Sequence, residues 1–458
     1  MRALERAEIE GTKGTGYKKY LLALLLLILA FNFVDRLALG ISLQGIKADL
    51  ALSDTQLGLL SGIAFALFYS VGGIPIARWA DRGDRVVIIS LTVAIWSVLV
   101  ALCGAAQSFL QLMLVRVGVG IGEAGCIPPA TSLIADHFTR TERPRATAVY
   151  MLGGPLSVVF GYFLAGWLNQ IFGWRLMFAI LGLPGLALSL LAWVTLKEPR
   201  HGNRNDDFEG ASLAGRQHDD RSPQPTLRIV FRTLWSNITF RHLLFCFSII
   251  SFFGYGILQW QPAFFIRSYG MTTGELGSWF AVIYGLGGIL GTYLGGEISS
   301  RYAASNESLQ LKWAAGAYVG FGAVSAFIYL APNHYLAFGL MGVTALGGAT
   351  VNGPLYATIQ TLVPPQMRAV AMAVIFLFSN LIGMGLGPLV TGVLSDVLQR
   401  FVHAESLRYS LLALCPGYVW GGWHVWQASR TIYRDMETGK SASAFLGRNA
   451  TKYSETLQ

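Results

Sequence analysis

Long apolar segments alternate with short polar ones along almost the whole chain. A membrane-spanning helix needs about 20 mostly apolar residues. Segments that meet this requirement lie at 20–43, 55–77, 86–106, 109–135, 146–171 and 174–196, and again at 242–266, 274–299, 311–331, 335–362, 369–397 and 406–428. The pattern predicts an all-α membrane protein with twelve transmembrane helices in two six-helix bundles.

Polar segments set the expected domain boundaries. We expect a cytoplasmic N-terminal segment at 1–19, an N-terminal bundle at 20–196, a cytoplasmic linker at 197–241, a C-terminal bundle at 242–430 and a cytoplasmic tail at 431–458. Most of the linker is polar, contains prolines and lacks apolar periodicity, which is typical of a connection between domains. The residues near Leu227 to Leu234 are the exception and predict a short surface helix.

Composition and charge support a membrane protein. Hydrophobic residues make up 53% of the 458 positions and charged residues only 13%, whereas a soluble domain carries about 25% charged residues. The net charge of +9 follows the positive-inside rule, because most Arg and Lys fall in segments that are cytoplasmic if both termini are. The predicted outside segments keep Lys47, Arg175, Arg267, Arg400 and Arg408. We therefore expect a multi-pass protein of the inner (plasma) membrane, with no nucleic-acid partner.

The two halves contain similar segments at equivalent places. The segment RPRATA at 143–148 enters the fifth predicted span, and QMRAVA at 366–371 enters the eleventh. A duplicated unit of this kind places a transported substrate near the bilayer midplane, between the halves.

The first predicted span carries two adjacent charges, Asp35 and Arg36, just after Asn32. A charge near the middle of a membrane helix costs about 2.5–3.5 kcal/mol, so these side chains must face a bundle interior or a watered cavity. Adjacent helix positions point about 100° apart, so the two charged side chains cannot reach the same site. The fourth span carries Arg116 and Glu123 on one face, about 10 Å apart along the helix. This spacing is too long for a direct pair, but another helix could insert partners between them.

Together these four charges are neutral when all are ionised. If the first and fourth helices meet at a cavity, protonation of one acid leaves a net positive charge that favours a phosphate or a carboxylate. Asp35 and Glu123 are therefore candidates for proton coupling. Arg36, Arg116 and Asn32 complete a candidate substrate and charge network. The alternative is a static network that only fixes helix register.

Several motifs resemble the major facilitator superfamily over nearly the whole chain. The segment ARWADRGDR at 77–85 is similar to the family's loop motif between the second and third helices, although it departs at Ala77. The segment RVGVGIG at 116–122 resembles its fourth-helix motif. The resemblance implies a transporter that works by alternating access.

A narrower set of motifs resembles the spinster family of lipid transporters. These motifs are NFVDR at 32–36, GEA at 122–124, IAD at 134–136 and GWR at 173–175. The resemblance implies transport of single-chain lipids such as lysophospholipids or sphingosine phosphates. Some bacterial relatives are assigned small organic acids instead, so this substrate class stays open.

Polar residues at one end of the predicted bundle are candidates for gating. Asp81, Arg82 and Arg85 lie at the predicted cytoplasmic surface, and Asp136 lies at the same end of the fourth span. We expect a conformational lock in which Asp81 faces the N-terminus of the eleventh helix, because the dipole of that helix favours an anion. Asp136 would pair with Arg82 or Arg85. A purely orienting role is the alternative.

Four polar or aromatic residues of the second half are candidate cavity-lining residues: Gln259, Trp260, Asn352 and Asn380. Packing between helices explains each of them equally well.

We therefore predict a secondary active transporter that moves an amphipathic lysolipid or sphingolipid-like substrate by proton-coupled alternating access. A proton-coupled symporter of a small organic anion, or a multidrug efflux transporter, is the alternative. A membrane enzyme is disfavoured because the sequence has no nucleophile–base arrangement, nucleotide-binding motif or metal spacing. A receptor or scaffold would not explain paired intramembrane charges in a duplicated fold. We expect no cofactor and no metal, protons as the coupling ion, surrounding membrane lipids, and a monomer.

Overall fold

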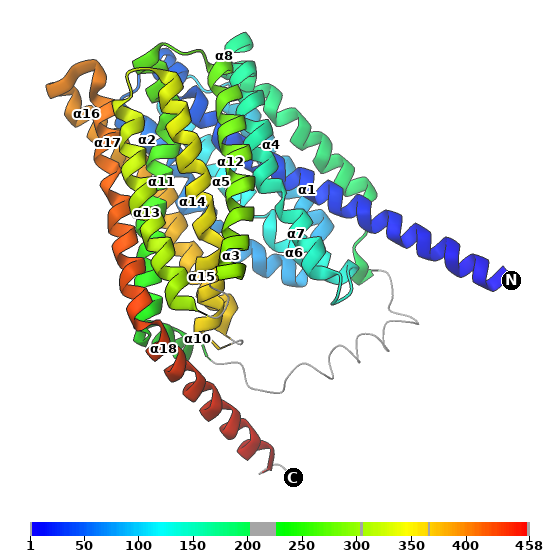
Figure 1. The fold of residues 1–458 in the computed structure, drawn as a ribbon. Coiled ribbons are helices and arrows are strands. Elements are labelled where there is room, and N and C mark those ends of the chain that lie inside the picture. Colours follow the sequence, from blue (N-terminus) through cyan, green and yellow to red (C-terminus); the bar gives the residue numbers. More distant parts are fainter. Residues whose placement is uncertain (1, 202–225, 303–305, 365–366, 456–458) are drawn as a thin grey trace. The chain divides into compact units, whose positions relative to one another are not determined.

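The computed structural model describes residues 2–201, 226–302, 306–364 and 367–455 (Figure 1). Every regular element within these residues is a helix. The first part of the chain forms α1 (Arg2–Leu50), α2 (Asp54–Ser61), α3 (Ile63–Arg82), α4 (Arg85–Cys103), α5 (Phe109–Glu123), α6 (Ile127–His137), α7 (Arg143–Met151), α8 (Gly153–Thr195) and η1 (Pro199–His201). The rest forms α10 (Leu227–Ser236), α11 (Ile238–Tyr269), α12 (Thr273–Tyr302), α13 (Glu307–Leu330), α14 (His334–Leu362), α15 (Arg368–Phe378), η3 (Ser379–Leu386), α16 (Gly387–Val402), η4 (His403–Glu405), α17 (Ser406–Leu414) and α18 (Pro416–Glu455).

Ten helical runs in the described residues are long and apolar enough to cross a membrane, and two of them contain two spans each. Arg143–Thr195 has 53 residues, which is about 80 Å of helix against a hydrocarbon core of about 30 Å. Gly173 interrupts this run with a φ of 75°, which glycine adopts without steric cost. Arg368–Glu437 has 70 residues, and His403 interrupts it with a φ of 50°. Dividing both runs confirms the predicted twelve spans.

The terminal helices extend beyond the predicted spans. α1 begins at Arg2, so most of the segment predicted at 1–19 continues the first helix, and α18 continues to Glu455 through the predicted tail. Hydropathy marks where a helix leaves the apolar region, and a helix ends only where its backbone pattern stops. The short helix predicted near Leu227 is confirmed as α10.

The chain forms two compact units, and each contains segments from distant parts of the sequence. The first unit comprises 1–205, 258–285 and 388–400, and the second comprises 206–257, 286–387 and 401–458. In the first unit α1 packs along α8, and α4 packs against both α5 and α8. In the second unit α13 packs against α14 and α18. The predicted bundles at 20–196 and 242–430 stay a prediction.

Several spans are broken within their length. The fourth span breaks between α5 and α6, where the main-chain amides of Ala124, Gly125 and Cys126 bond to carbonyls three or four residues back. A β-carbon on Gly122 would lie 2.8 Å from the Cβ of Trp96, so this glycine lets α5 approach α4 closely. In the eleventh span the π-helix η3 separates α15 from α16, and π-helical turns recur at functional sites. Irregular backbone at membrane depth occurs where it is buried in protein or lines a cavity.

Candidate functional site

The first and fourth spans form two charge pairs in the interior of the first unit. The Nη1 atom of Arg116 donates a hydrogen bond of 2.6 Å to Oδ2 of Asp35. The Nη2 and Nε atoms of Arg36 donate bonds of 2.7 and 3.0 Å to Oε2 of Glu123. Asp35 and Arg36 are neighbours on α1 and point in different directions, so each reaches a different residue of α5. The helix inserted between Arg116 and Glu123 is therefore α1.

Burial differs between these side chains. Asp35, Arg116 and Glu123 are each no more than 2% exposed, whereas the side chain of Arg36 is 17% exposed. Asn32 is fully buried, and its Nδ2 lies 3.5 Å from the main-chain carbonyl of Glu123, at the long limit of a hydrogen bond. Arg36 is thus the cation of the network that keeps access to its surroundings.

Each buried carboxylate accepts hydrogen bonds at only one of its two oxygens. Oδ1 of Asp35 and Oε1 of Glu123 are buried and have no hydrogen-bond partner among the described residues. An unpaired buried carboxylate oxygen is costly, whereas a proton on the same carboxyl group removes the charge. Oδ1 of Asp35 and Oε1 of Glu123 are therefore unsatisfied acceptors within the network.

Three aromatic rings surround the guanidinium group of Arg36. Its Cζ lies 4.7 Å from the ring centre of Phe33, 4.5 Å from that of Phe65 and 4.7 Å from that of Tyr69. Phe65 is buried, and Phe33 and Tyr69 are partly exposed. A cation near a ring face gains about 0.5–2 kcal/mol per contact, more where water is excluded. These rings were not among the predicted site residues, and the i, i+3 spacing of Phe33 and Arg36 was the local signal for one of them.

A second cluster joins the start of α4 to the end of α6 and to the segment after α8. The fully buried Arg85 pairs with Asp136 at 2.6 Å and also pairs with Glu198. Burial raises the pKa of the Glu198 carboxyl, but the hydrogen bonds from Arg85 outweigh it, so the pKa lies below its usual value. The predicted pairing of Asp136 is therefore observed with Arg85. Glu198 was assigned to the linker, because nothing local marks it as a partner.

The other predicted gating residues lie beside this cluster. Asp81 and Arg82 are exposed at the end of α3. The guanidinium group of Arg200 donates to the main-chain carbonyls of Ala80 and Asp81 at 3.0 and 3.1 Å. The contact expected between Asp81 and the eleventh helix would join the two units and stays a prediction.

A third cluster, absent from the predicted site residues, centres on Asp54 at the start of α2. Arg267 donates to both carboxylate oxygens of Asp54, at 2.6 and 2.8 Å. Lys47 and Ser395 each donate a further bond of 2.6 Å to the same carboxylate. Asp396 accepts bonds from the main-chain amides of Asp54 and Thr55 at 3.0 and 2.7 Å, so it caps the N-terminus of α2. The cluster joins α1, α2, α11 and α16.

The cations predicted on the non-cytoplasmic side of the membrane were the sequence signal for this cluster. A cation at this side departs from the positive-inside pattern. Lys47 and Arg267 both pair with Asp54. Arg175 pairs in the same way with Asp49, at 2.9 Å.

The four candidate cavity-lining residues have different surroundings. Trp260 is fully buried and its Nε1 donates to the carbonyl of Pro388 at 2.9 Å. This residue therefore packs between helices, which was the alternative to lining a cavity. Gln259 is partly buried, and its Nε2 has no hydrogen-bond partner among the described residues. Asn352 is exposed on α14, and Asn380 is half-buried in η3. Among the described residues, no group of three or more His, Cys, Asp and Glu side chains has an arrangement that could hold a metal ion.

Twelve apolar spans with opposite charges paired inside them define a multi-pass membrane transporter. A family model for the Major Facilitator Superfamily matches residues 25–388, and the chain belongs to this family. The family and the fold are those of transporters.

The individual relatives add a narrower likeness. The structure of a bacterial homolog of the human lysosomal transporter Spinster, inward-facing and unoccupied, is 31% identical, with a TM-score of 0.79 over 92% of this chain and 98% of that one. An MFS-type efflux pump of Mycolicibacterium smegmatis is 31% identical over 90% of this chain and 92% of its own length. A probable L-galactonate transporter of Escherichia coli is 26% identical over 83% of this chain and 84% of its length. The chain is a major facilitator transporter related to Spinster.

Proposed function

We propose that the protein moves an amphipathic lysolipid or sphingolipid-like anion across the membrane by proton-coupled alternating access. The observation that carries this proposal is the state of Arg36. Its guanidinium group is partly exposed, is enclosed by aromatic rings and donates to Oε2 of Glu123.

The surroundings of Arg36 suit a head group joined to an apolar chain. A guanidinium group donates several hydrogen bonds in one plane and pairs well with phosphate or carboxylate oxygens. Phe33 and Tyr69 are partly exposed next to it and offer apolar surface to the part of the substrate that follows the head group. A substrate that combines an anion with an apolar chain uses both features.

The charge balance of the network supports coupling to protons. Asp35, Glu123, Arg36 and Arg116 sum to zero when all four are ionised. An incoming anion competes with Glu123 for Arg36. The released carboxylate of Glu123 is buried, and its Oε1 already lacks a hydrogen-bond partner, so it then favours a proton. Protonation of Glu123 removes its charge, so that Arg36 can pair with the anion instead. In this mechanism, substrate and proton binding favour each other.

Two other substrate classes follow from the relatives. The efflux pump and the probable L-galactonate transporter align with most of this chain. A small organic acid would use the same guanidinium groups without the aromatic rings. The apolar contacts next to Arg36 favour the amphipathic substrate over this alternative.

The surrounding roles are part of the same proposal. The protein would lie in the inner membrane with both termini cytoplasmic, act as a monomer and use protons without a cofactor. Asp81 would lock the cytoplasmic side against the eleventh helix. The pairing of Arg85 with Asp136 and Glu198 supports this role, because it fixes the start of α4 next to the end of α3, which carries Asp81.

Transport in proteoliposomes with an imposed pH gradient tests the proposal. Lysophosphatidic acid and galactonate serve as probes for the two substrate classes. We expect uptake of the lysolipid against its gradient, and we expect Asp35→Asn and Glu123→Gln to abolish this accumulation. Asp49→Asn, which neutralises an exposed carboxylate, is the control and should accumulate substrate normally. Wild-type accumulation by both buried-site variants would exclude proton coupling through these acids, and accumulation of galactonate alone would exclude the lipid substrate.

A further inference from the structure

The short helix α10 has three different surfaces. It begins at Leu227 and ends at Ser236, and only Asn237 separates it from α11. α11 is a membrane-crossing run of 32 residues that begins at Ile238. α10 is about 15 Å long and is joined through one residue to the start of this membrane-crossing run.

Three pairs of residues at i, i+4 spacing make these surfaces. Val230 and Leu234 are each 2% exposed and pack into the core of the second unit. On a helix with about 100° per residue, the ridge of Phe231 and Trp235 lies beside this buried ridge. The third ridge, Arg228 and Arg232, lies beside the aromatic ridge, on the side away from the core.

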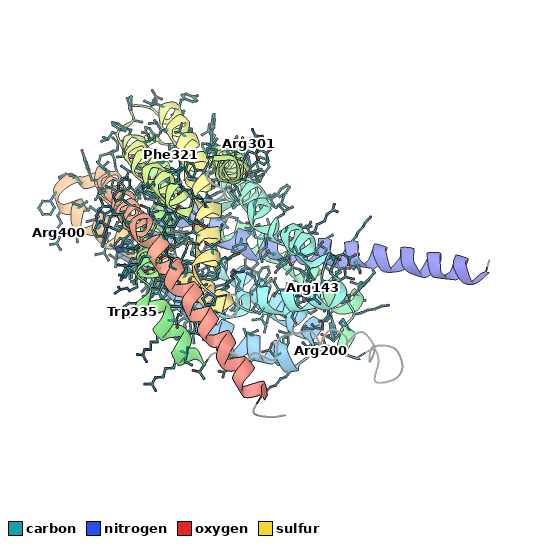
Figure 2. The ribbon with its side chains drawn as sticks, turned by 60° about the horizontal axis from the view of Figure 1, so that its bottom comes forward. Arg143, Arg200, Trp235, Arg301, Phe321 and Arg400 are labelled. Atoms are coloured by element: carbon teal, nitrogen blue, oxygen red, sulfur yellow. The ribbon has the colours of Figure 1, made fainter. Side chains whose placement is uncertain are left out.

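The side chains of the second and third ridges are exposed among the described residues. Phe231 is 52% exposed and Trp235 is 56% exposed, and both arginines are exposed. Figure 2 shows Trp235 on α10, where this helix projects from the rest of its unit. The sequence of α10, LRIVFRTLWS, contains no acidic residue. The exposed side of α10 is therefore both apolar and positively charged.

We propose that the exposed side of α10 binds the anionic phospholipids of the leaflet at the start of α11. Tryptophan and phenylalanine lie favourably at the boundary of head groups and acyl chains, and guanidinium groups pair with lipid phosphates. The buried ridge anchors the helix to the protein, so the aromatic and arginine ridges are presented together without an ordering cost at binding. A soluble partner would need a surface that is both acidic and apolar and that reaches the membrane plane.

The size of the effect follows from the two arginines. A basic residue near an anionic membrane surface contributes about fivefold to association. Arg228 and Arg232 together predict a preference of roughly 30-fold for an anionic over a zwitterionic lipid at this site.

A fluorescent probe on α10 tests the proposal in the full-length protein. A bimane group is attached at position 235 through Trp235→Cys, since the four native cysteines are buried. The protein is reconstituted in phosphatidylcholine vesicles that contain brominated phosphatidylglycerol or brominated phosphatidylcholine. Quenching by each lipid gives the relative association constant of phosphatidylglycerol at the probe. We expect a value near 30 that falls toward one in Arg228→Gln/Arg232→Gln.

A matched control removes two other exposed arginines, with Arg140→Gln/Arg145→Gln. This variant should keep the value of the parent. A relative constant of one in the parent, or an equal decrease in the control, would overturn the anionic-lipid assignment. Strong quenching by aqueous iodide without quenching by brominated lipid would also overturn it and would indicate a surface that faces water or a soluble partner.

Discussion

The pair of Asp35 and Arg116 should be strongly coupled, because neither side chain has access to water. The two residues are 2% and 1% exposed, and their charged atoms are 2.6 Å apart. Unit charges at about 4 Å and an effective dielectric of 20 attract by about 4 kcal/mol, which offsets their loss of hydration. Removing one partner therefore leaves a buried charge without the partner that it contacts directly.

We expect Arg116→Gln and Asp35→Asn each to lower the free energy of unfolding by about 3–5 kcal/mol. The double variant Asp35→Asn/Arg116→Gln contains two neutral amides and leaves no buried charge from this pair. It should be more stable than the sum of the single losses implies, with a coupling energy of about 1–3 kcal/mol.

Unfolding by sodium dodecyl sulfate in mixed micelles, followed by tryptophan fluorescence, measures these free energies. The exposed pair of Arg175 and Asp49 is the control, since its side chains are 37% and 45% exposed. Asp49→Asn should cost no more than about 1 kcal/mol. Strictly additive losses at Asp35 and Arg116, or single losses as small as that of the control, would refute the reasoning.

Three further results are expected. Asp54→Asn should destabilise the protein by about 3–5 kcal/mol in the same assay. Lys47→Met should cost much less, because the lysine is partly exposed and Arg267 still compensates the carboxylate of Asp54. Equal losses in the two variants would contradict the assigned geometry. Cysteines at Asn333 and Asn306, exposed N-cap residues at opposite ends of α13, should differ in labelling by an impermeant thiol reagent on intact cells. Position 333 should react and position 306 should not, and the reverse pattern would invert the topology. The lowered pKa of Glu198 stabilises the fold above the unfolded pKa of about 4.3, and this contribution is lost as the pH falls through the folded value. Glu198→Gln should therefore reduce the change in the free energy of unfolding between pH 6 and pH 3, about the range of this titration. An unchanged pH profile would show that this carboxyl does not contribute.

The sequence alone determined the helical spans and the residues that carry charge inside them. Hydrophobicity is a local property, so runs of about 20 apolar residues identify each span without knowledge of its neighbours. The cost of an intramembrane charge is also local, which is why Asp35, Arg36, Arg116 and Glu123 could be selected and a partner on another helix expected. The positions of the helix ends were less accurate, because α1 and α18 continue as helix beyond their apolar parts.

Only the tertiary structure decided which charges meet. Arg116 is 81 residues from Asp35, Arg85 is 113 residues from Glu198, and Arg267 is 213 residues from Asp54. No periodicity reports such a pairing, because it depends on how the helices pack. The same holds for the aromatic rings around Arg36, two of which come from α3. Charge type and hydropathy can be assigned from single residues and short segments, whereas a site requires several side chains to be fixed at one place, and the packing of the helices provides this.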